Sequence, residues 1–429
     1  MAAESCHSRS LSWLVKSCIP ADPARHIAVP VPITTTGVTN PCSTDPTTEE
    51  SPISALPDEL LLECLARVPR ASLPPLPAVC RRFESLLAAE AFLFLRRAHG
   101  RLCPSLLAVS VSAHGTNFAR ALLQFNHEAR PELEVAALPV PLSLLHCGGG
   151  SAFAHARAVA VGREVFLIGR GTTLRVDALT GVVRACAPTL FPRKKFAAAA
   201  VGGRIYVAGG SARTAAVEEY DPAADAWRVV AEAPRWRYGC AGAGAGGVFY
   251  IAGGVAVTGP GRDGTRALEA HACAGSVDAL HVASGAWAWA RPRAVPGGGC
   301  VVGACGAGEH LYVVASHAVD LSFWRWCGSG VNRGGGDGSR GACGWVALEA
   351  PPVPRGSVGL GMAVRVAMAG VGGDRVVAVV NVAAVRGHNA GATALEGVVL
   401  VYNIAGGEWS RAPDMPPGFR RAACAAVEC

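Results

Sequence analysis

The fold is decided by the stretch Phe196-Ala-Ala-Ala-Ala-Val201-Gly202-Gly203-Arg204-Ile205-Tyr206-Val207-Ala208-Gly209-Gly210, which predicts two strands around a tight glycine turn. Two further strand-like runs follow, Val217-Glu218-Glu219-Tyr220-Asp221-Pro222 and, after another turn, Trp227-Arg228-Val229-Val230. Together they predict one antiparallel meander of four strands, which we name a, b, c and d in chain order.

The same pattern returns elsewhere in the chain. It is clear from Cys240 through Phe249-Tyr250-Ile251-Ala252-Gly253-Gly254 to Val277-Asp278-Ala279-Leu280 and Trp287. Fainter copies contain the runs Val165–Ile168, Leu311–Val314 and Val376–Val379, the last continuing to Val401-Tyr402-Asn403 and Trp409. Strands of type a begin near residues 155, 196, 240, 300, 361 and 422, which predicts an all-β propeller of six blades.

The two ends of this region complement each other. The last strand of type a, Ala422 to Glu428, has no b strand after it. Conversely, Leu106–Val111 has the pattern of a b strand with no a strand before it. We therefore expect the C-terminal strand to complete the first blade and close the ring.

The double glycine and the Tyr…Trp pair resemble kelch repeats. The resemblance implies that the glycine pair lets strand b lie close to the propeller axis, and that the aromatic residues on strands c and d fill the wedge between blades. In the second blade the glycine pair is degraded to Gly169-Arg170 and the tryptophan is missing, so that blade rests on spacing. The structural residues implied are Gly209, Gly210, Tyr220, Trp227, Gly253, Gly254, Trp287, Tyr402 and Trp409.

A helical pattern precedes the repeats. A first helix is expected to begin at Pro57-Asp58-Glu59, because proline needs no amide partner in a first turn and carboxylates favour the positive end of the helix dipole. Apolar residues then recur at i, i+4 and i+7 up to Pro69. A second helix follows Pro77, and a third runs through Ala91–Leu95. Three helices this short cannot bury their apolar faces alone, so the module is expected to need a partner.

Four segments of this module resemble an F-box in order and spacing: Leu56–Leu60, Cys64–Pro69, Val79–Phe83 and Ser85–Leu87. Phe83 stands where many members carry Trp, which keeps an aromatic side chain. A generic helical cap on the propeller is the alternative interpretation. The resemblance implies that the module packs against the Skp-type adaptor of an SCF ubiquitin ligase, which also contains a cullin scaffold. The adaptor-binding residues implied are Leu56, Pro57, Leu61, Leu65, Pro69, Val79, Cys80 and Phe83.

Composition sets the limits on this interpretation. Hydrophobic residues make up 51% of the 429 residues and charged residues 17%, which favours a packed interior. Residues 1–52 are rich in Pro and Thr and predict a disordered leader, followed by the F-box at 53–99 and the kelch propeller at 104–429. The apolar patch Leu11–Val15 is far too short to span a bilayer, so no membrane partner is expected.

The net charge of +7 comes almost wholly from arginine. The basic residues are not massed on one helix or tail, so no nucleic-acid partner is expected. The only lysines are Lys16, Lys194 and Lys195, which would be the acceptors if the chain were modified by its own ligase.

Signals for catalysis are missing from the sequence. The 16 cysteines are scattered without a CxxC pair, which favours free thiols in a reducing compartment, the cytoplasm or the nucleus. The histidines form no metal-binding spacing, and the glycine run 242–247 precedes a strand rather than a helix that could hold a phosphate. We expect no metal, no cofactor and no catalytic residue.

Basic residues recur at or near the junctions between strand d and the next strand a. In a meander these junctions share one face with the b–c loops, so the cations would ring the axial mouth, walled by the long loops Val255–Ser276 and Ala384–Gly397. Such a ring suits an acidic or phosphorylated segment of a target protein. The alternative is a set of solvated or blade-bracing side chains. The candidate substrate-binding residues are Arg157, Lys195, Arg237, Arg293, Arg355 and Arg421.

The sequence leaves three functions open. The first is a non-catalytic substrate-recognition subunit of an SCF-type E3 ubiquitin ligase, as in plant-type members of the F-box/kelch-repeat family, with the F-box on the face opposite the mouth. The alternative is a kelch scaffold that binds proteins without a ligase role, and the third is a propeller enzyme.

Overall fold

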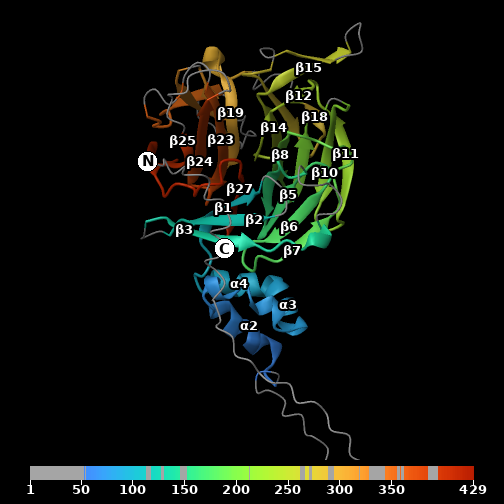
Figure 1. The fold of residues 1–429 in the computed structure, drawn as a ribbon, viewed down its shortest axis with the longest axis vertical. Coiled ribbons are helices and arrows are strands. Elements are labelled where there is room, and N and C mark those ends of the chain that lie inside the picture. The colour runs from blue at the N-terminus through green and yellow to red at the C-terminus, as the bar shows by residue number, and fades with distance from the viewer. Residues whose placement is uncertain are drawn as a thin grey trace, which may run out of the picture.

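The computed structural model describes residues 53, 55–112, 117–126, 130–144, 152–211, 213–260, 266–269, 273–287, 294–317, 319–327, 344–354, 358, 362–384 and 395–429. The predicted leader, residues 1–52, lies outside the described residues. The rest forms a small helical module below a ring of antiparallel sheets (Figure 1).

The helical module contains the three predicted helices, α2 (Asp58–Arg67), α3 (Arg81–Ala88) and α4 (Glu90–Ala98). Two short 3-10 turns, Arg70–Ser72 and Leu76–Ala78, join α2 to α3. The fully buried Arg96 of α4 donates hydrogen bonds to the carbonyls of Ala66 and Val68 at the C-terminal end of α2. A cation there satisfies carbonyls that the helix itself cannot pair, and it fixes α2 to α4.

Six four-stranded antiparallel sheets form the predicted six-bladed propeller. We number the blades in chain order and give their strands from the inside outwards. Blade 1 contains β27 (Ala423–Glu428), β1 (Pro104–Val111), β2 (Phe118–Gln124) and β3 (Glu132–Leu138). Blade 2 contains β4 (Arg157–Val161), β5 (Glu164–Ile168), β6 (Thr173–Asp177) and β7 (Val183–Cys186). Blade 3 contains β8 (Ala197–Val201), β9 (Arg204–Ala208), β10 (Ala216–Asp221) and β11 (Ala226–Glu232).

The remaining three blades follow the same plan. Blade 4 contains β13 (Ala241–Ala245), β14 (Val248–Ala252), β17 (Val277–His281) and β18 (Ala286–Trp287). Blade 5 contains β19 (Cys300–Ala307), β20 (His310–Ser316), β21 (Leu321–Cys327) and β22 (Gly344–Leu348). Blade 6 contains β23 (Met362–Val371), β24 (Arg375–Ala384), β25 (Leu395–Asn403) and β26 (Glu408–Arg411).

The ring closes through the C-terminal strand, as the sequence predicts. β27 pairs antiparallel with β1, with Ala425 opposite Leu107, and so supplies the inner strand of blade 1. The backbones of Cys103 and Cys429 exchange two hydrogen bonds of 3.0 and 3.1 Å at the end of this pairing. The first blade is therefore built from both ends of the propeller region.

Glycines of strand a allow the inner strands of neighbouring blades to approach each other closely. A Cβ atom added to Gly306 of β19 would overlap the carbonyl oxygen of Gly244 of β13, and one added to Gly370 would overlap that of Gly306. The prediction that the double glycines let strand b approach the axis is wrong. Gly209-Gly210 and Gly253-Gly254 instead follow strand b with φ between +68° and +86°, in turns that contact the segment leading into strand a.

The aromatic pairs lie at the blade boundaries. The rings of Tyr220 and Trp227 are 5.0 Å apart, and Trp227 Nε1 donates to the carbonyl of Ala187, just after the outer strand of blade 2. Tyr402 and Trp409 repeat this pairing at 5.2 Å, with Trp409 Nε1 donating to the carbonyl of Glu349 after blade 5. Each tryptophan thus ties its own blade to the preceding one.

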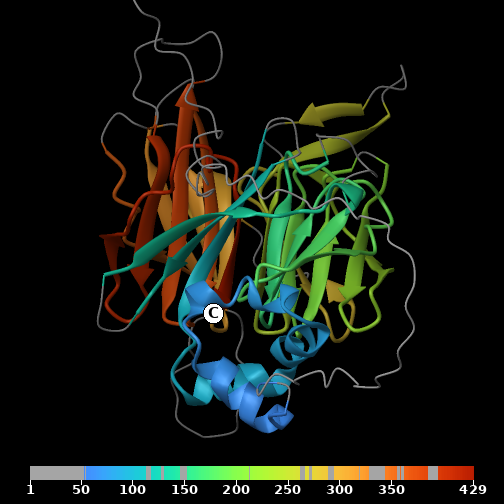
Figure 2. The same ribbon diagram turned by 60° about the horizontal axis from the view of Figure 1, so that its bottom comes forward.

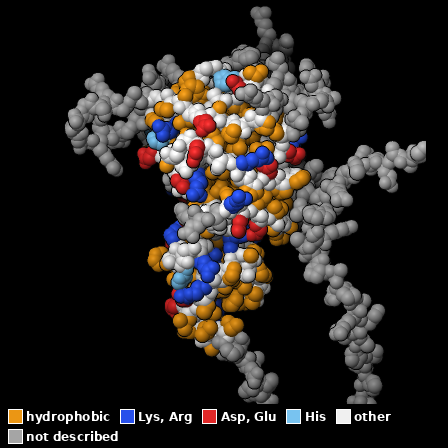
Figure 3. All heavy atoms as spheres, turned by 90° about the vertical axis from the view of Figure 1, so that its left-hand side faces the viewer, with side chains coloured by type: hydrophobic (Ala, Val, Ile, Leu, Met, Phe, Trp, Pro, Cys, Tyr) orange, Lys and Arg blue, Asp and Glu red, His pale blue; other side chains and the backbone are white. Residues whose placement is uncertain are grey.

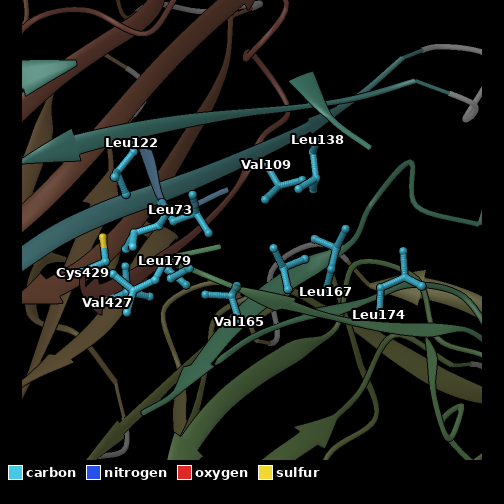
Figure 4. Packing of buried hydrophobic residues seen from close by; sticks show 14 of the residues in the cluster. Leu73, Val109, Leu122, Leu138, Val165, Leu167, Leu174, Leu179, Val427 and Cys429 are labelled. Atoms are coloured by element: carbon cyan, nitrogen blue, oxygen red, sulfur yellow. The ribbon is translucent and has the colours of Figure 1, made fainter. Parts of the chain in front are cut away.

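The helical module and the propeller share one hydrophobic core. The fully buried Leu73, between α2 and α3, lies among Leu122 of blade 1, Leu179 of blade 2 and Cys429 (Figure 4). Polar contacts surround this core: Arg163 donates to the carbonyl of Leu87, and ion pairs join Arg184 to Glu84 and Arg97 to Glu428. The two parts therefore form one packed body.

The module occupies the propeller face of the a–b and c–d turns. Arg163 lies in the a–b turn of blade 2, and Glu428 lies at the end of β27. The small sheet of β12 (Arg237–Tyr238), β15 (Val255–Pro260) and β16 (Arg266–Glu269) was not predicted and lies at the opposite end of the molecule (Figures 1 and 2). It includes part of the predicted loop Val255–Ser276, whereas most of the loop Ala384–Gly397 lies outside the described residues.

The glycine contacts predict a selective effect of one methyl group. Gly306→Ala should lower the free energy of unfolding by about 1–3 kcal/mol or more. The added Cβ atom would overlap the backbone of Gly244, so the inner strands would have to move apart. Gly344→Ala is the matched control, since no atom of the described residues lies within 4 Å of a Cβ added at Gly344, on the outer strand β22. Urea unfolding of the two variants measures the difference, and equal stabilities would contradict the close packing of the inner strands.

Candidate functional sites

The helical module exposes several large apolar side chains. The exposed fractions are 54% for Leu60, 64% for Val79 and 69% for Phe94. Hydrophobic side chains gather on this lower part of the molecule (Figure 3). Apolar side chains with this exposure on one small module are typical of a protein-binding surface. We call the exposed residues Leu60, Val79 and Phe94, with the motif residues Pro57 and Cys80, the adaptor face.

One arginine brings the separate motif segments together. Arg82 Nε donates to Asp58 Oδ1 over 2.7 Å, and the same guanidinium donates to the carbonyl of Leu56. The N-terminus of α2, with Pro57, is thereby held beside the start of α3, which follows Val79-Cys80. The Cys80 Sγ caps α3 by accepting a hydrogen bond from the Phe83 amide.

Two predicted adaptor-binding residues need correction. Leu61 and Leu65 are only 4% and 5% exposed and belong to the core that the module shares with the propeller, so they are inaccessible to a partner. The other predicted residues remain accessible: Pro57, Pro69, Val79 and Cys80 are exposed, and Leu56 and Phe83 are half-buried. The prediction did not include Leu60 and Phe94, which lie on the faces of their helices that the shared core leaves uncovered.

The second candidate site is a cavity of about 320 Å³ on the propeller axis, which we call the axial cavity. Residues at or just before the start of strand a in all six blades line it, so it opens on the face opposite the helical module. Its basic side chains are Arg157, Lys195, Arg365 and Arg421, with His155 beside them. None of the lining residues that the structure describes is acidic.

Burial, followed by repulsion between like charges, lowers the pKa values of three basic residues in the axial cavity. Burial, together with Lys194, Lys195, Arg365 and Arg421, lowers the pKa of His155 to about 4. Burial and the neighbouring arginines also lower the pKa of Lys195 and of Arg365. The repulsion between neighbouring cations, which adds to the effect of burial, indicates an excess of positive charge in the cavity.

The predicted ring of basic residues is only partly correct as a set of cavity residues. Lys195 and Arg421 line the axial cavity, as does Arg157, which also donates to the carbonyls of Phe196 and Cys240 and so braces the inner strands of blades 3 and 4. Arg293 and Arg355 lie outside the described residues. The prediction missed Arg365, because it lies inside strand a and not at a d–a junction; its signal is a charge between Val364 and Val366 on an inner strand.

Arg237 is a structural brace and not a substrate-binding residue. Its side chain is 1% exposed, pairs with Asp278 at 2.7 Å and donates to the carbonyl of Gly253. Blade 3 repeats the arrangement with Arg193, which pairs with Glu218 at 2.6 Å and donates to the carbonyl of Gly209. In both blades the arginine joins the d–a junction to strand c and to the double-glycine turn.

The described residues contain no group of three or more His, Cys, Asp or Glu side chains that could hold a metal ion. Within the same ranges, no helix has the length and apolar character needed to cross a membrane. Burial raises the pKa of the Cys424 thiol in the axial cavity to about 12, so this cysteine is neutral and acts as a small apolar residue.

Comparisons with known proteins agree with both parts of the structure. Residues 53–95 match the F-box domain family, and residues 192–234 match the Kelch motif. The chain is 43% identical to "F-box/kelch-repeat protein At5g26960" of Arabidopsis thaliana, over 99% of this chain and all of that protein. It is 26% identical to "F-box/kelch-repeat protein At1g67480" from the same plant, over 44% of this chain and 51% of that protein.

The fold and these matches define a protein that joins an F-box to a kelch-repeat β-propeller. With a relative of this identity over nearly its whole length, the chain belongs to the F-box/kelch-repeat protein family.

The role of Arg237 leads to a stability prediction with a control on the same carboxylate. Arg237→Ala should lower the free energy of unfolding by about 3–5 kcal/mol, because Asp278 would remain buried without its partner. Arg235 is 40% exposed and 3.7 Å from the other Asp278 oxygen, so Arg235→Ala should change stability by at most about 1 kcal/mol. The midpoints of urea unfolding measure the stability of the two variants. A loss of at most about 1 kcal/mol in both would contradict the role of Arg237 as a structural brace.

Proposed function

We propose that the protein is the substrate-recognition subunit of an SCF-type E3 ubiquitin ligase. The adaptor face binds the Skp-type adaptor, which links the chain to the cullin scaffold, and the propeller binds the protein to be ubiquitinated. One observation carries the proposal: an exposed apolar surface on the F-box and a charged cavity in the propeller lie on opposite faces of one packed body.

The arrangement suits a receptor that holds two partners at once. Pro57, Val79 and Cys80 are exposed members of the motif segments that resemble an F-box, and the propeller covers none of the three. The axial cavity is far from the F-box, so a bound target leaves the adaptor face free. The family relationship supports the same division of labour, in which neither part needs catalytic residues of its own.

The adaptor face can be tested with a matched pair of valines. Val79→Asp should abolish co-purification of the Skp-type adaptor, because it places a charge in an interface that buries apolar surface. Val319→Asp is the control, since Val319 is 67% exposed and lies on the propeller. The double variant Leu56→Ala, Pro57→Ala should behave like Val79→Asp with the propeller still folded.

Adaptor retained by both the Val79 variant and the double variant would contradict the F-box assignment and favour a kelch scaffold without a ligase role. Circular dichroism and the unfolding midpoint show in each case that the fold is intact.

The lysines lead to a separate prediction about turnover. Lys194 is exposed and Lys195 is half-buried, both just before β8, and Lys16 lies outside the described residues. If the ligase modifies its own receptor, replacing all three lysines by arginine should lengthen the half-life of the protein in cells. In the Val79→Asp background, which cannot recruit the adaptor, the same replacement should have no effect. An unchanged half-life in the wild-type background would point to the N-terminal amine or another route.

A further inference from the structure

The basic residues of the axial cavity form a continuous arc. Arg365 comes from blade 6, Arg421 from the segment entering blade 1, Arg157 from blade 2 and Lys195 from the segment entering blade 3. These four blades are neighbours in the ring, because β23, β27, β4 and β8 contact each other in that order. Each of the four neighbouring blades on this side of the cavity therefore contributes one cation.

On the other side of the cavity, the described lining residues are uncharged. Blade 4 contributes the segment 239–242, which contains Cys240 and glycine or alanine, and blade 5 contributes Val301, Val302, Gly303 and Ala304. Small and apolar residues leave room there and offer no hydrogen-bonding side chain except the thiol. The cavity thus combines an anion-binding wall with an apolar wall.

Unlike Arg157, whose guanidinium donates to backbone carbonyls, the other three cations of the arc are available for a ligand. Arg365 and Arg421 are exposed, and among the described residues neither side chain has an ion pair or a hydrogen-bond partner. Lys195 contacts the ring of Tyr238 at 5.5 Å and has no carboxylate partner in the described part of the chain. This differs from Arg193 and Arg237, whose charges are balanced by Glu218 and Asp278. Burial, reinforced by repulsion from the neighbouring cations, lowers the pKa of both Lys195 and Arg365.

We propose that the axial cavity binds the phosphate group of a phosphorylated side chain on the target protein. A phosphate monoester carries close to two negative charges and three acceptor oxygens in a compact group, which matches several converging cations better than a single carboxylate does. The carbon atoms of the phosphorylated side chain would face the apolar wall of blades 4 and 5. The use of this site for target recognition rests on the proposed ligase function, whereas phosphate binding itself does not.

The size of the cavity supports a side chain as the occupant. A volume of about 320 Å³ admits one phosphorylated side chain and its immediate neighbours, but not a folded element of the target. Guanidinium groups hold phosphate oxygens through paired hydrogen bonds, so Arg365 and Arg421 are expected to make the specific contacts. Arg157 and Lys195 would add charge from the adjacent blades.

The first experiment measures phosphate binding directly. Purified full-length protein, without the adaptor, is titrated with inorganic phosphate by calorimetry at constant ionic strength in chloride. Wild-type protein should bind phosphate, and Arg365→Glu and Arg421→Glu should each weaken binding by about tenfold or more. The matched control is Arg213→Glu, an exposed arginine in the b–c loop of blade 3 on the same face but outside the cavity, which should bind within about twofold of wild type. Absence of phosphate binding, or equal losses in all three variants, would overturn the proposal.

The second experiment identifies the source of the phosphate. Immobilised wild-type and Arg365→Glu proteins are incubated with a peptide digest of a cell extract, with and without phosphatase treatment, and captured peptides are sequenced by mass spectrometry. Enrichment of phosphopeptides by wild type, lost after phosphatase and lost in the variant, supports the proposal. Capture of unphosphorylated acidic peptides, or a small organic phosphate found on the protein by native mass spectrometry with no phosphopeptide captured, would overturn it.

Failure of the ligase function would look different. Loss of adaptor binding is read from co-purification, whereas phosphate binding is read from the purified chain. A protein that binds phosphopeptides but never the adaptor would keep the cavity assignment and remove the ligase.

Discussion

The packing of blades 3 to 6 depends on the close approach of backbone to backbone around the propeller axis. Gly244, Gly306 and Gly370 lie where inner strands of neighbouring blades meet, and no side chain fits there. Because each sheet twists, the outer strands of neighbouring blades lie further apart than the inner strands do. Aromatic residues such as Trp227 and Trp409 fill the space between them. The same constraint shapes the axial cavity: most of its wall is glycine, alanine and valine, so only a few long cationic side chains carry its chemistry.

Local pattern was enough to predict most of the fold. The order of strands within each blade and the number of blades follow from strand-like runs that are close neighbours in the chain. Closure by β27 follows from the two runs left without a neighbour at opposite ends of the propeller region. The neighbouring sequence could not predict which arginine braces a blade and which one lines the cavity, because Arg237 and Arg421 both lie at d–a junctions. The difference lies on strand c of the blade that each arginine precedes. In blade 4, Asp278 of strand c forms an ion pair with Arg237. In blade 1, strand c is β2, which has no acidic residue to pair with Arg421.

Sequence pattern was also not enough to predict which residues form the adaptor face. The apolar stripe of α2 was correctly predicted, but the pattern does not indicate which part of the molecule packs against it. Leu61 and Leu65 are covered by a core that includes residues of blades 1 and 2, so part of the surface assigned to a separate partner is used within the chain. Leu60, Val79 and Phe94 are among the apolar side chains that a partner can still reach.

The shared core also determines how the two sites relate in space. Only residues 99–103 separate α4 from β1, and Arg163, Arg184 and Arg97 fix the helices to blades 1 and 2 at three separate points. Any swing of the F-box would expose Leu73 and break these contacts together. The direction from the adaptor face to the axial cavity is therefore set by the fold itself. A target held in the cavity would be presented at a constant distance and angle from the ligase, so the flexibility needed for ubiquitin transfer must come from the target or from the other subunits.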